Sequence, residues 1–181
     1  TNNTAVGTNA LAGNTTATGN TAVGSQSMQL TTTGSQNVAV GYNTLNATSA
    51  GSTSSTAIGY NALAVTTASY NTAIGATAAD AITTGANNTV IGYNALRTAT
   101  TALNNVVIGS GAMASVPAAQ AVSDCIAIGY GAMTGVAGTT STASNNVAIG
   151  TSALNVVTTG TQNIAIGNSA LAAQTTGLQN V

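Results

Sequence analysis

Residues 3–24, NTAVGTNALAGNTTATGNTAVG, contain the phrase NTAVG twice, seventeen residues apart. A phrase that recurs at a fixed short spacing is the signature of a repeat architecture, in which each repeat is one structural unit. Similar small-hydrophobic-Gly phrases recur along the whole chain at spacings of 16 to 18 residues, apart from two of 20 and 21. Their ten glycines are Gly7, Gly24, Gly41, Gly59, Gly75, Gly92, Gly109, Gly129, Gly150 and Gly167.

The repeats predict a single array over residues 1–181. The chain opens on the Thr-Asn-Asn that leads into the first glycine, and it stops at Gln179, Asn180 and Val181, which match the opening of an eleventh repeat. We therefore expect a segment of a longer fibre that is cut within a repeat at both ends.

One repeat is too short for a pair of helices, which needs about thirty or more residues. Residues 162–177, QNIAIGNSALAAQTTG, contain a β-branched run at 164–166 and a second apolar pair at 170–171. Short runs rich in β-branched residues and bounded by glycine favour strands. The sequence predicts an all-β protein, a parallel β-solenoid or β-roll of about ten coils with two short strands in each coil.

An asparagine precedes nearly every one of these glycines by four residues. Stacked coils would place these side chains about 4.8 Å apart, within reach of amide-to-amide hydrogen bonds. Ser55 and Cys125 replace asparagine in two repeats. The expected ladder comprises Asn20, Asn37, Asn71, Asn88, Asn105, Asn146 and Asn163, with Asn3 and Asn180 at its ends.

Two larger apolar columns flank the glycines, and we expect both to form buried seams. The residue before the glycine is always Val or Ile, from Val6 to Ile166, and the residue four positions after it is Leu, Met or Ala, from Leu11 to Leu171. Alanine stands two residues before most of the glycines, which suits either a thin coil or the close approach of a neighbouring chain. The glycines themselves are expected at tight corners, where φ is positive or a Cβ has no room.

The charged residues exclude several functions. The chain has one Arg, two acidic residues, no Lys and no His, so neither a nucleophile–base pair nor a usual metal cluster can be assembled. We expect no enzyme, no catalytic or metal-binding residue and no cofactor. Nucleic acid is excluded as a partner because phosphate neutralisation needs several cations, and the apolar runs are too short to insert in a membrane.

The few reactive side chains have structural interpretations. Cys125 occupies the asparagine column and is expected to be a buried structural thiol, or alternatively a contact between symmetry-related copies. Asp80 and Asp124 lie in variable segments and are expected to be solvated. Arg97 is expected at a solvated edge, with pairing to Asp80 one coil earlier as the alternative.

Four of the five tyrosines directly follow one of the repeat glycines, and asparagine follows three of them. They could form exposed platforms for sugar rings, or they could cover the corner and pack on the next coil. The possible glycan-contact residues are Tyr42, Tyr60, Tyr93, Tyr130, Asn43, Asn61 and Asn94.

The repeats NNVAIGTSAL (145–154) and QNIAIGNSAL (162–171) resemble those in the head domains of trimeric autotransporter adhesins, the YadA-like heads. The NTAVG form also resembles repeats of bacteriophage tail fibres and related bacterial surface fibres. The resemblance covers the whole chain and implies a left-handed β-roll, a homotrimer and an extracellular location on a virion or cell surface. The adhesin heads have a shorter repeat, so their cross-section can differ.

Two functions follow from these observations. The favoured one is a structural or adhesive segment of a trimeric fibre, which extends from a virion or cell surface and contacts a host polysaccharide or receptor. The alternative is an ice-binding solenoid, because the chain is rich in threonine and poor in charge. Ice-binding faces need threonine at one outward position in nearly every coil, whereas the residue three before the glycine is Thr in five of the ten repeats, most of them in the first half.

Overall fold

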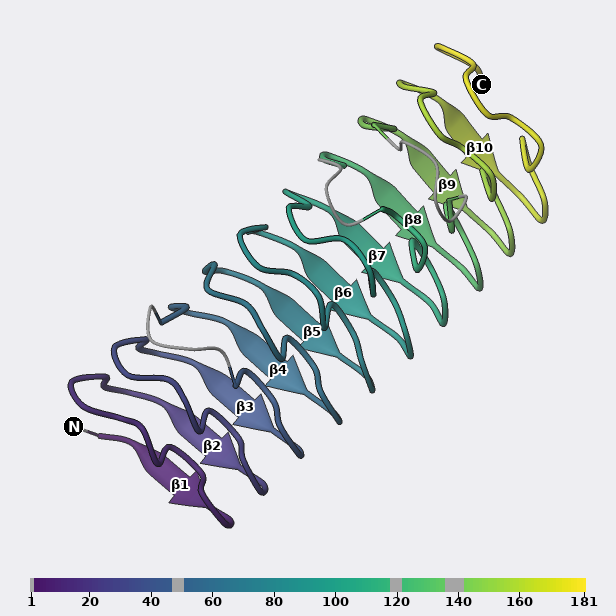
Figure 1. Ribbon diagram of the computed structural model, residues 1–181. Coiled ribbons are helices and arrows are strands. Elements are labelled where there is room, and N and C mark those ends of the chain that lie inside the picture. The colour runs from purple at the N-terminus through teal and green to yellow at the C-terminus, as the bar shows by residue number, and fades with distance from the viewer. Residues whose placement is uncertain (1, 47–50, 118–121, 136–141) are drawn as a thin grey trace.

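The computed structural model describes residues 2–46, 51–117, 122–135 and 142–181. It is a β-solenoid in which every coil contributes one three-residue strand to a single ten-stranded parallel sheet. The N- and C-termini lie at opposite ends of the stack (Figure 1). The strands are β1 (Thr4–Val6), β2 (Thr21–Val23), β3 (Val38–Val40), β4 (Thr56–Ile58), β5 (Thr72–Ile74), β6 (Thr89–Ile91), β7 (Val106–Ile108), β8 (Ile126–Ile128), β9 (Val147–Ile149) and β10 (Ile164–Ile166).

The strand register is the same at every step of the stack. Each strand pairs with the next one along the chain, and equivalent residues face one another, as in the pairs Thr72 with Thr89 and Ile74 with Ile91. The twenty-residue step from Val106 to Ile126 pairs in the same way. The predicted parallel β-solenoid of about ten coils is therefore confirmed, and extra residues in a repeat do not disturb the sheet.

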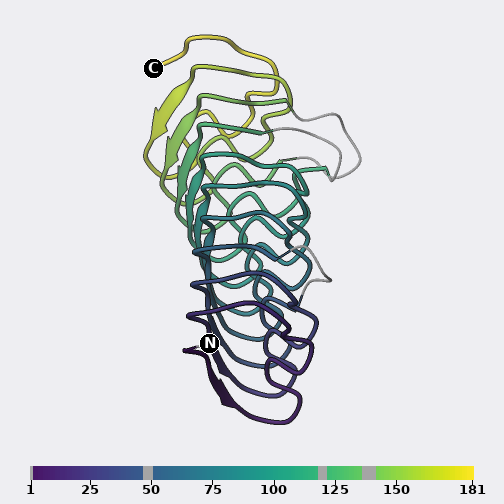
Figure 2. The same ribbon diagram turned by 90° about the vertical axis from the view of Figure 1, so that its left-hand side faces the viewer.

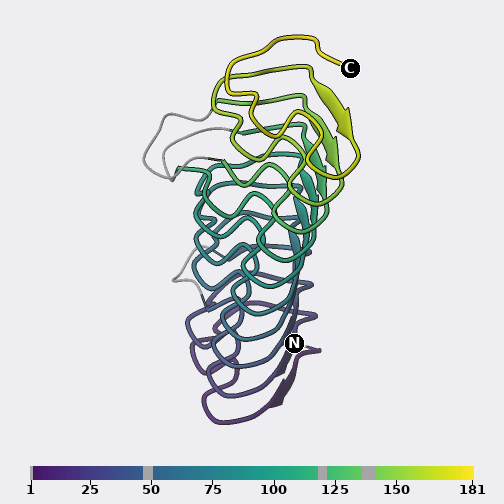
Figure 3. The same cartoon turned by 90° about the vertical axis from the view of Figure 1, so that its right-hand side faces the viewer.

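Among the described residues, the remainder of each coil consists of turns, bends and two isolated bridges rather than a second strand. Figures 2 and 3 show the strands along one side of the stack and the turn segments along the other. The expected second strand is wrong because its residues adopt left-handed backbone conformations, such as φ 55° at Asn94 and φ 49° at Leu96. The Leu96 amide nevertheless donates to the carbonyl of Ala112 on the next coil, 2.9 Å away, so the turns also stack through hydrogen bonds.

The interior of the coil is filled from both sides. The central residue of the strands is almost fully buried from β2 to β10, and it is alanine in most coils. From the turn side, the column that contains Leu63, Leu96 and Leu154 is buried, as predicted. Each three-residue strand directs only its central side chain inward. Where this side chain lies opposite a leucine or methionine of the turn segment, the remaining space fits a small residue.

The Val/Ile column before the glycine is not a buried seam, and that prediction is wrong. Ile58 and Ile74 are 37% and 36% exposed, whereas the alanine before each of them, Ala57 or Ala73, is completely buried. Because successive strand residues point to opposite faces, the first and third residues of every strand lie on the outside of the sheet. The sequence pattern established that small and large residues alternate along the strand, but we assigned the larger residues to the interior.

Candidate functional site

The asparagines four residues before the repeat glycines form a buried hydrogen-bonded ladder. Asn88 donates through Nδ2 to Oδ1 of Asn71 at 3.0 Å and to the carbonyl of Ala102 at 2.8 Å. Its own Oδ1 accepts the backbone amide of Asn105 at 3.1 Å and Nδ2 of that residue at 3.0 Å. The ladder asparagines can be buried because their side-chain amide groups take the place of water as hydrogen-bond partners of the backbone.

Ser55 and Cys125 interrupt the chain of amides without exposing it. Ser55 accepts the backbone amide of Asn71 through Oγ at 3.2 Å, and its own amide donates to Oδ1 of Asn37 at 2.9 Å. The backbone amide of Cys125 donates to Oδ1 of Asn105 at 3.0 Å. The ladder thus has a structural role, and at these two positions it is reduced to backbone contacts and smaller side chains.

Cys125 is a buried free thiol, as expected for a structural residue. It is 1% exposed, and its Sγ lies 3.3 Å from the carbonyl oxygen of Ala143. Burial raises the pKa of the thiol from 9.0 to about 11. A side chain that points into the coil is not placed to contact another copy, so the alternative of a contact between copies is not supported.

We expect Cys125 to be almost unreactive in the folded chain. At pH 8 the raised pKa lowers the thiolate fraction by about 100-fold relative to an unfolded thiol, and burial also blocks the reagent. The measurement is the labelling rate with an aromatic disulfide reagent at pH 8, with the same chain in urea as the control. Prompt labelling of the folded chain would contradict the burial.

The raised pKa of Cys125 also makes the stability of the fold depend on pH. The folded state favours the neutral thiol, so this contribution is fully present below about pH 9 and is lost as the pH rises through about 11.

The repeat glycines stand at corners with positive φ, from 127° at Gly7 to 141° at Gly92. A Cβ added to Gly92 would lie 2.5 Å from the carbonyl oxygen of Gly109. Successive glycines therefore pack backbone against backbone, and they allow the coil to turn directly after each strand. They form a structural column, since their atoms are occupied by contacts with the next coil.

The tyrosines that follow these glycines form an exposed column, which we call the tyrosine column. Tyr42 and Tyr60 lie on adjacent coils with ring centroids 5.6 Å apart and an interplanar angle of 9°. Tyr93 is 60% exposed and Tyr130 is 68% exposed. The structure thus divides the predicted glycan-contact residues into one closed stack and two separated rings.

The asparagines that follow the tyrosines line the same edge. Asn43 donates through Nδ2 to Oδ1 of Asn61 at 2.9 Å, and Oδ1 of Asn94 accepts the hydroxyl of Thr77. All three asparagines are half-buried. Their amides are ordered by contacts between coils, while the tyrosine rings beside them project outward.

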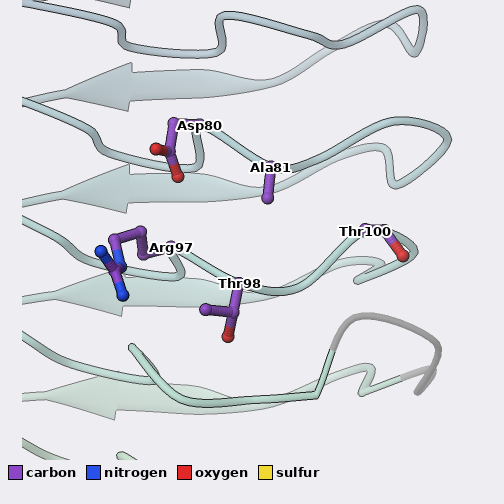
Figure 4. Close-up of a pocket in the computed structure, with 5 residues that line it drawn as sticks. All are labelled: Asp80, Ala81, Arg97, Thr98 and Thr100. Carbon is purple, nitrogen blue, oxygen red and sulfur yellow. The ribbon is translucent and has the colours of Figure 1, made fainter.

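A shallow cleft of about 300 Å³ lies between the turns that follow β5 and β6. It is lined by Asp80, Ala81, Arg97, Thr98 and Thr100. Figure 4 shows Asp80 and Arg97 at equivalent places on neighbouring coils. One carboxylate and one guanidinium can bind a polar group.

Asp80 is less solvated than the sequence predicted. Its Oδ1 is buried and has no hydrogen-bond partner among the described residues. Desolvation raises the pKa of the carboxyl group, and the nearby charge of Arg97 partly offsets the shift. Asp124 is exposed as expected, and it accepts a hydrogen bond from Asn104 Nδ2 at 3.1 Å.

The outer face of the sheet is the largest continuous feature that the sequence prediction missed. It consists of the first and third residues of the ten strands, all of them Thr, Val or Ile, and we call it the outer sheet face. Val38 in β3 and Ile126 in β8, each with strands on both sides, are 38% and 37% exposed. The signal was in the triplets themselves, since a small residue between two β-branched ones marks the inward position of a thin coil.

No group of three His, Cys, Asp or Glu side chains among the described residues could hold a metal ion. Nor do the described segments include a helix long and apolar enough to cross a membrane.

Comparison with known proteins adds no assignment, since no protein-family model, no curated protein and no solved structure matches this chain.

Proposed function

We propose that this chain is a structural and adhesive segment of an extracellular trimeric fibre, either a bacteriophage tail fibre or a bacterial surface adhesin. Three copies associate through their outer sheet faces, and the stacked coils hold the attachment function away from the virion or cell. The observation that carries the proposal is an uncovered parallel sheet. Parallel sheets are almost always covered on both faces, and here the coil covers only the inner one.

The composition of the outer sheet face supports association. It carries no charged residue in any of the ten strands, although charge is the usual means of keeping an exposed sheet soluble. The side chains are β-branched and lose little entropy when they pack against a neighbour. The resemblance to trimeric adhesin heads and tail fibres favours three chains and an extracellular location. The proposed role is non-catalytic, in keeping with a chain that has no His or Lys.

The trimer is tested by placing charge on the outer sheet face. We expect the wild-type chain to have three times the monomer mass, and the double variant Ile58→Asp, Ile74→Asp to be a folded monomer. These side chains already point outward in one chain, so an aspartate costs little in the monomer but would be buried and unpaired between copies. The measurements are light scattering after gel filtration and circular dichroism on the same sample.

The matched control is Val65→Asp, which places the same charge on an apolar residue that is 47% exposed but lies outside the strands. It should leave the trimer intact. A β-rich wild-type monomer would contradict the proposal, and dissociation by Val65→Asp would show that the interface is not the outer sheet face.

One observation keeps ice binding as a second candidate. The outer sheet face is a regular array with threonine as the outward first residue of β1, β2, β4, β5 and β6. The other strands begin with Val or Ile, so the threonine row is incomplete. Thermal hysteresis of a monomeric chain would favour ice binding, whereas a trimer that covers this face would not leave it free for ice.

A further inference from the structure

We propose that the tyrosine column contains two slots, each of which binds one ring of a neutral carbohydrate. The lower slot lies between Tyr60 and Tyr93 with Ala76 at its base. The upper slot lies between Tyr93 and Tyr130 with Ser110 at its base. This inference rests on the proposed fibre function for its extracellular setting, and it adds the class of ligand and its place.

The register of the sheet sets the width of the slots. Strands β4, β5 and β6 pair in sequence, as do β6, β7 and β8, so the tyrosines on either side of each slot are two coils apart. Two coils correspond to about 9.6 Å. A ring midway would lie about 4.8 Å from each tyrosine ring, within the roughly 4.5–7 Å at which ring pairs pack.

The stacked pair shows what a filled position looks like. Tyr42 and Tyr60 occupy adjacent coils, and their rings are nearly parallel at 5.6 Å, which leaves no space for a third ring. The same pair indicates that rings in this column can present their faces along the fibre axis. Ala76 and Ser110 stand at equivalent positions but carry no ring, so the neighbouring tyrosine faces are left uncovered by the column.

Hydrogen-bond donors are present beside the slots. Oδ1 of Asn61 is occupied by Asn43, and Oδ1 of Asn94 is occupied by Thr77. Among the described residues, neither Nδ2 group of Asn61 or Asn94 has a hydrogen bond to an acceptor. A pyranose has an apolar C–H face that packs on aromatic rings and hydroxyl groups at its rim, and these amides are donors for such hydroxyls.

The charge of the chain selects carbohydrate over other stacking ligands. Nucleobases also stack on exposed tyrosines, but nucleic acid binding depends on several Lys or Arg side chains that neutralise phosphate. Arg97 is the only cation in the sequence, and it lines the cleft described above rather than a slot. A neutral sugar needs no such partner.

The test compares a variant in which tyrosines fill both slots with a variant that lacks the tyrosine between them. The probes are the methyl glycosides of glucose, galactose and mannose, and the measurement is saturation-transfer NMR from the 181-residue chain to the sugar ring protons. We expect at least one probe to bind the wild type. The variant Ala76→Tyr, Ser110→Tyr should weaken that binding at least tenfold although it adds two aromatic rings. Tyr93→Ala removes the wall that both slots share and should have a similar effect.

Tyr42→Ala is the matched control, because Tyr42 lines neither slot, and it should bind as the wild type does. The proposal is overturned if none of the three sugars gives saturation transfer with folded wild-type chain, if filling the slots leaves or increases binding, or if Tyr42→Ala is as damaging as Tyr93→Ala. It is also overturned if the slot variants lose the trimer, since the tyrosines would then contact another copy. Loss of sugar binding with an intact trimer leaves the fibre proposal standing.

Discussion

Replacing Gly92 with alanine is expected to lower the free energy of unfolding by more than about 4 kcal/mol, a loss that few single substitutions cause. Two effects coincide at this corner. The backbone has φ 141°, which an L side chain rarely adopts, and the added Cβ would lie 2.5 Å from the carbonyl oxygen and 2.6 Å from the carbonyl carbon of Gly109. Neither atom can move away easily, because Gly109 packs in the same way against Gly129.

Gly111→Ala is the control for the Gly92 substitution. Gly111 also has positive φ, at 68°, but an added Cβ would meet no atom within 4 Å. Its cost should be about 1 kcal/mol, the penalty for a left-handed residue alone. Urea unfolding followed by far-ultraviolet circular dichroism compares the two variants, and hydrogen exchange shows whether the loss is local to β6 and β7. Equal midpoints for the two variants would contradict the close packing of the corner glycines.

Asn88→Ala is expected to cost about 2–5 kcal/mol, because it leaves at least two buried backbone groups without their partners. The amide of Asn105 loses the side-chain oxygen to which it donates at 3.1 Å, and the carbonyl of Ala102 loses the Nδ2 group at 2.8 Å. The site is 1% exposed, so water cannot replace either contact without opening the coil. The measurement is again the urea midpoint.

Two further variants test whether the loss of stability is specific to the ladder asparagine or follows from any substitution in this turn. Asn88→Ser should recover part of the loss, since Ser55 already occupies an equivalent position and accepts the next backbone amide. Asn87→Gly alters the exposed neighbour, whose φ of 58° glycine adopts without strain, and it should be nearly neutral. A neutral Asn88→Ala would mean that the ladder contributes no net stability.

The sequence predicted the parts of this fold that depend on the period. Asn88 and Gly92 recur at fixed positions in the repeat, and stacking places such residues in register whatever the detailed shape of the coil. The inward side of the strands was harder to predict. In a triplet such as Thr72, Ala73 and Ile74, hydrophobicity favours isoleucine as the buried residue, but the central position is the one that points inward, so Ala73 is completely buried and Ile74 is 36% exposed.

The backbone conformation of the turn segments could not be predicted from the secondary-structure propensities of their residues. Leu96 forms a short apolar pair with Ala95 and favours a helix or strand by composition, yet it has φ 49°. Such a conformation costs energy locally and is stabilised by contacts with adjacent coils, which a single repeat does not reveal. For the same reason the sequence placed Asp80 in solvent, whereas the stacking of neighbouring turns buries one of its oxygens.

The candidate sites were predicted to different degrees. The sequence identified the tyrosines that follow the repeat glycines, because these positions follow directly from the period. It did not show that Tyr42 and Tyr60 stack on one another, which closes one position and leaves two open. The outer sheet face was missed because its Val and Ile residues had been assigned to the interior.

The left-handed residues have a consequence for how this chain folds. In the coil that contains β6, Asn87, Asn94 and Leu96 all have positive φ, at a cost of about 1 kcal/mol or more for each. The hydrogen bonds that offset this cost run to adjacent coils, as from Asn94 to Ala76 and from Leu96 to Ala112. A solitary coil therefore bears the strain without the compensation, and adding a coil to an existing stack is easier than nucleating a new one. We therefore expect such an array to fold by nucleation followed by the addition of one coil at a time.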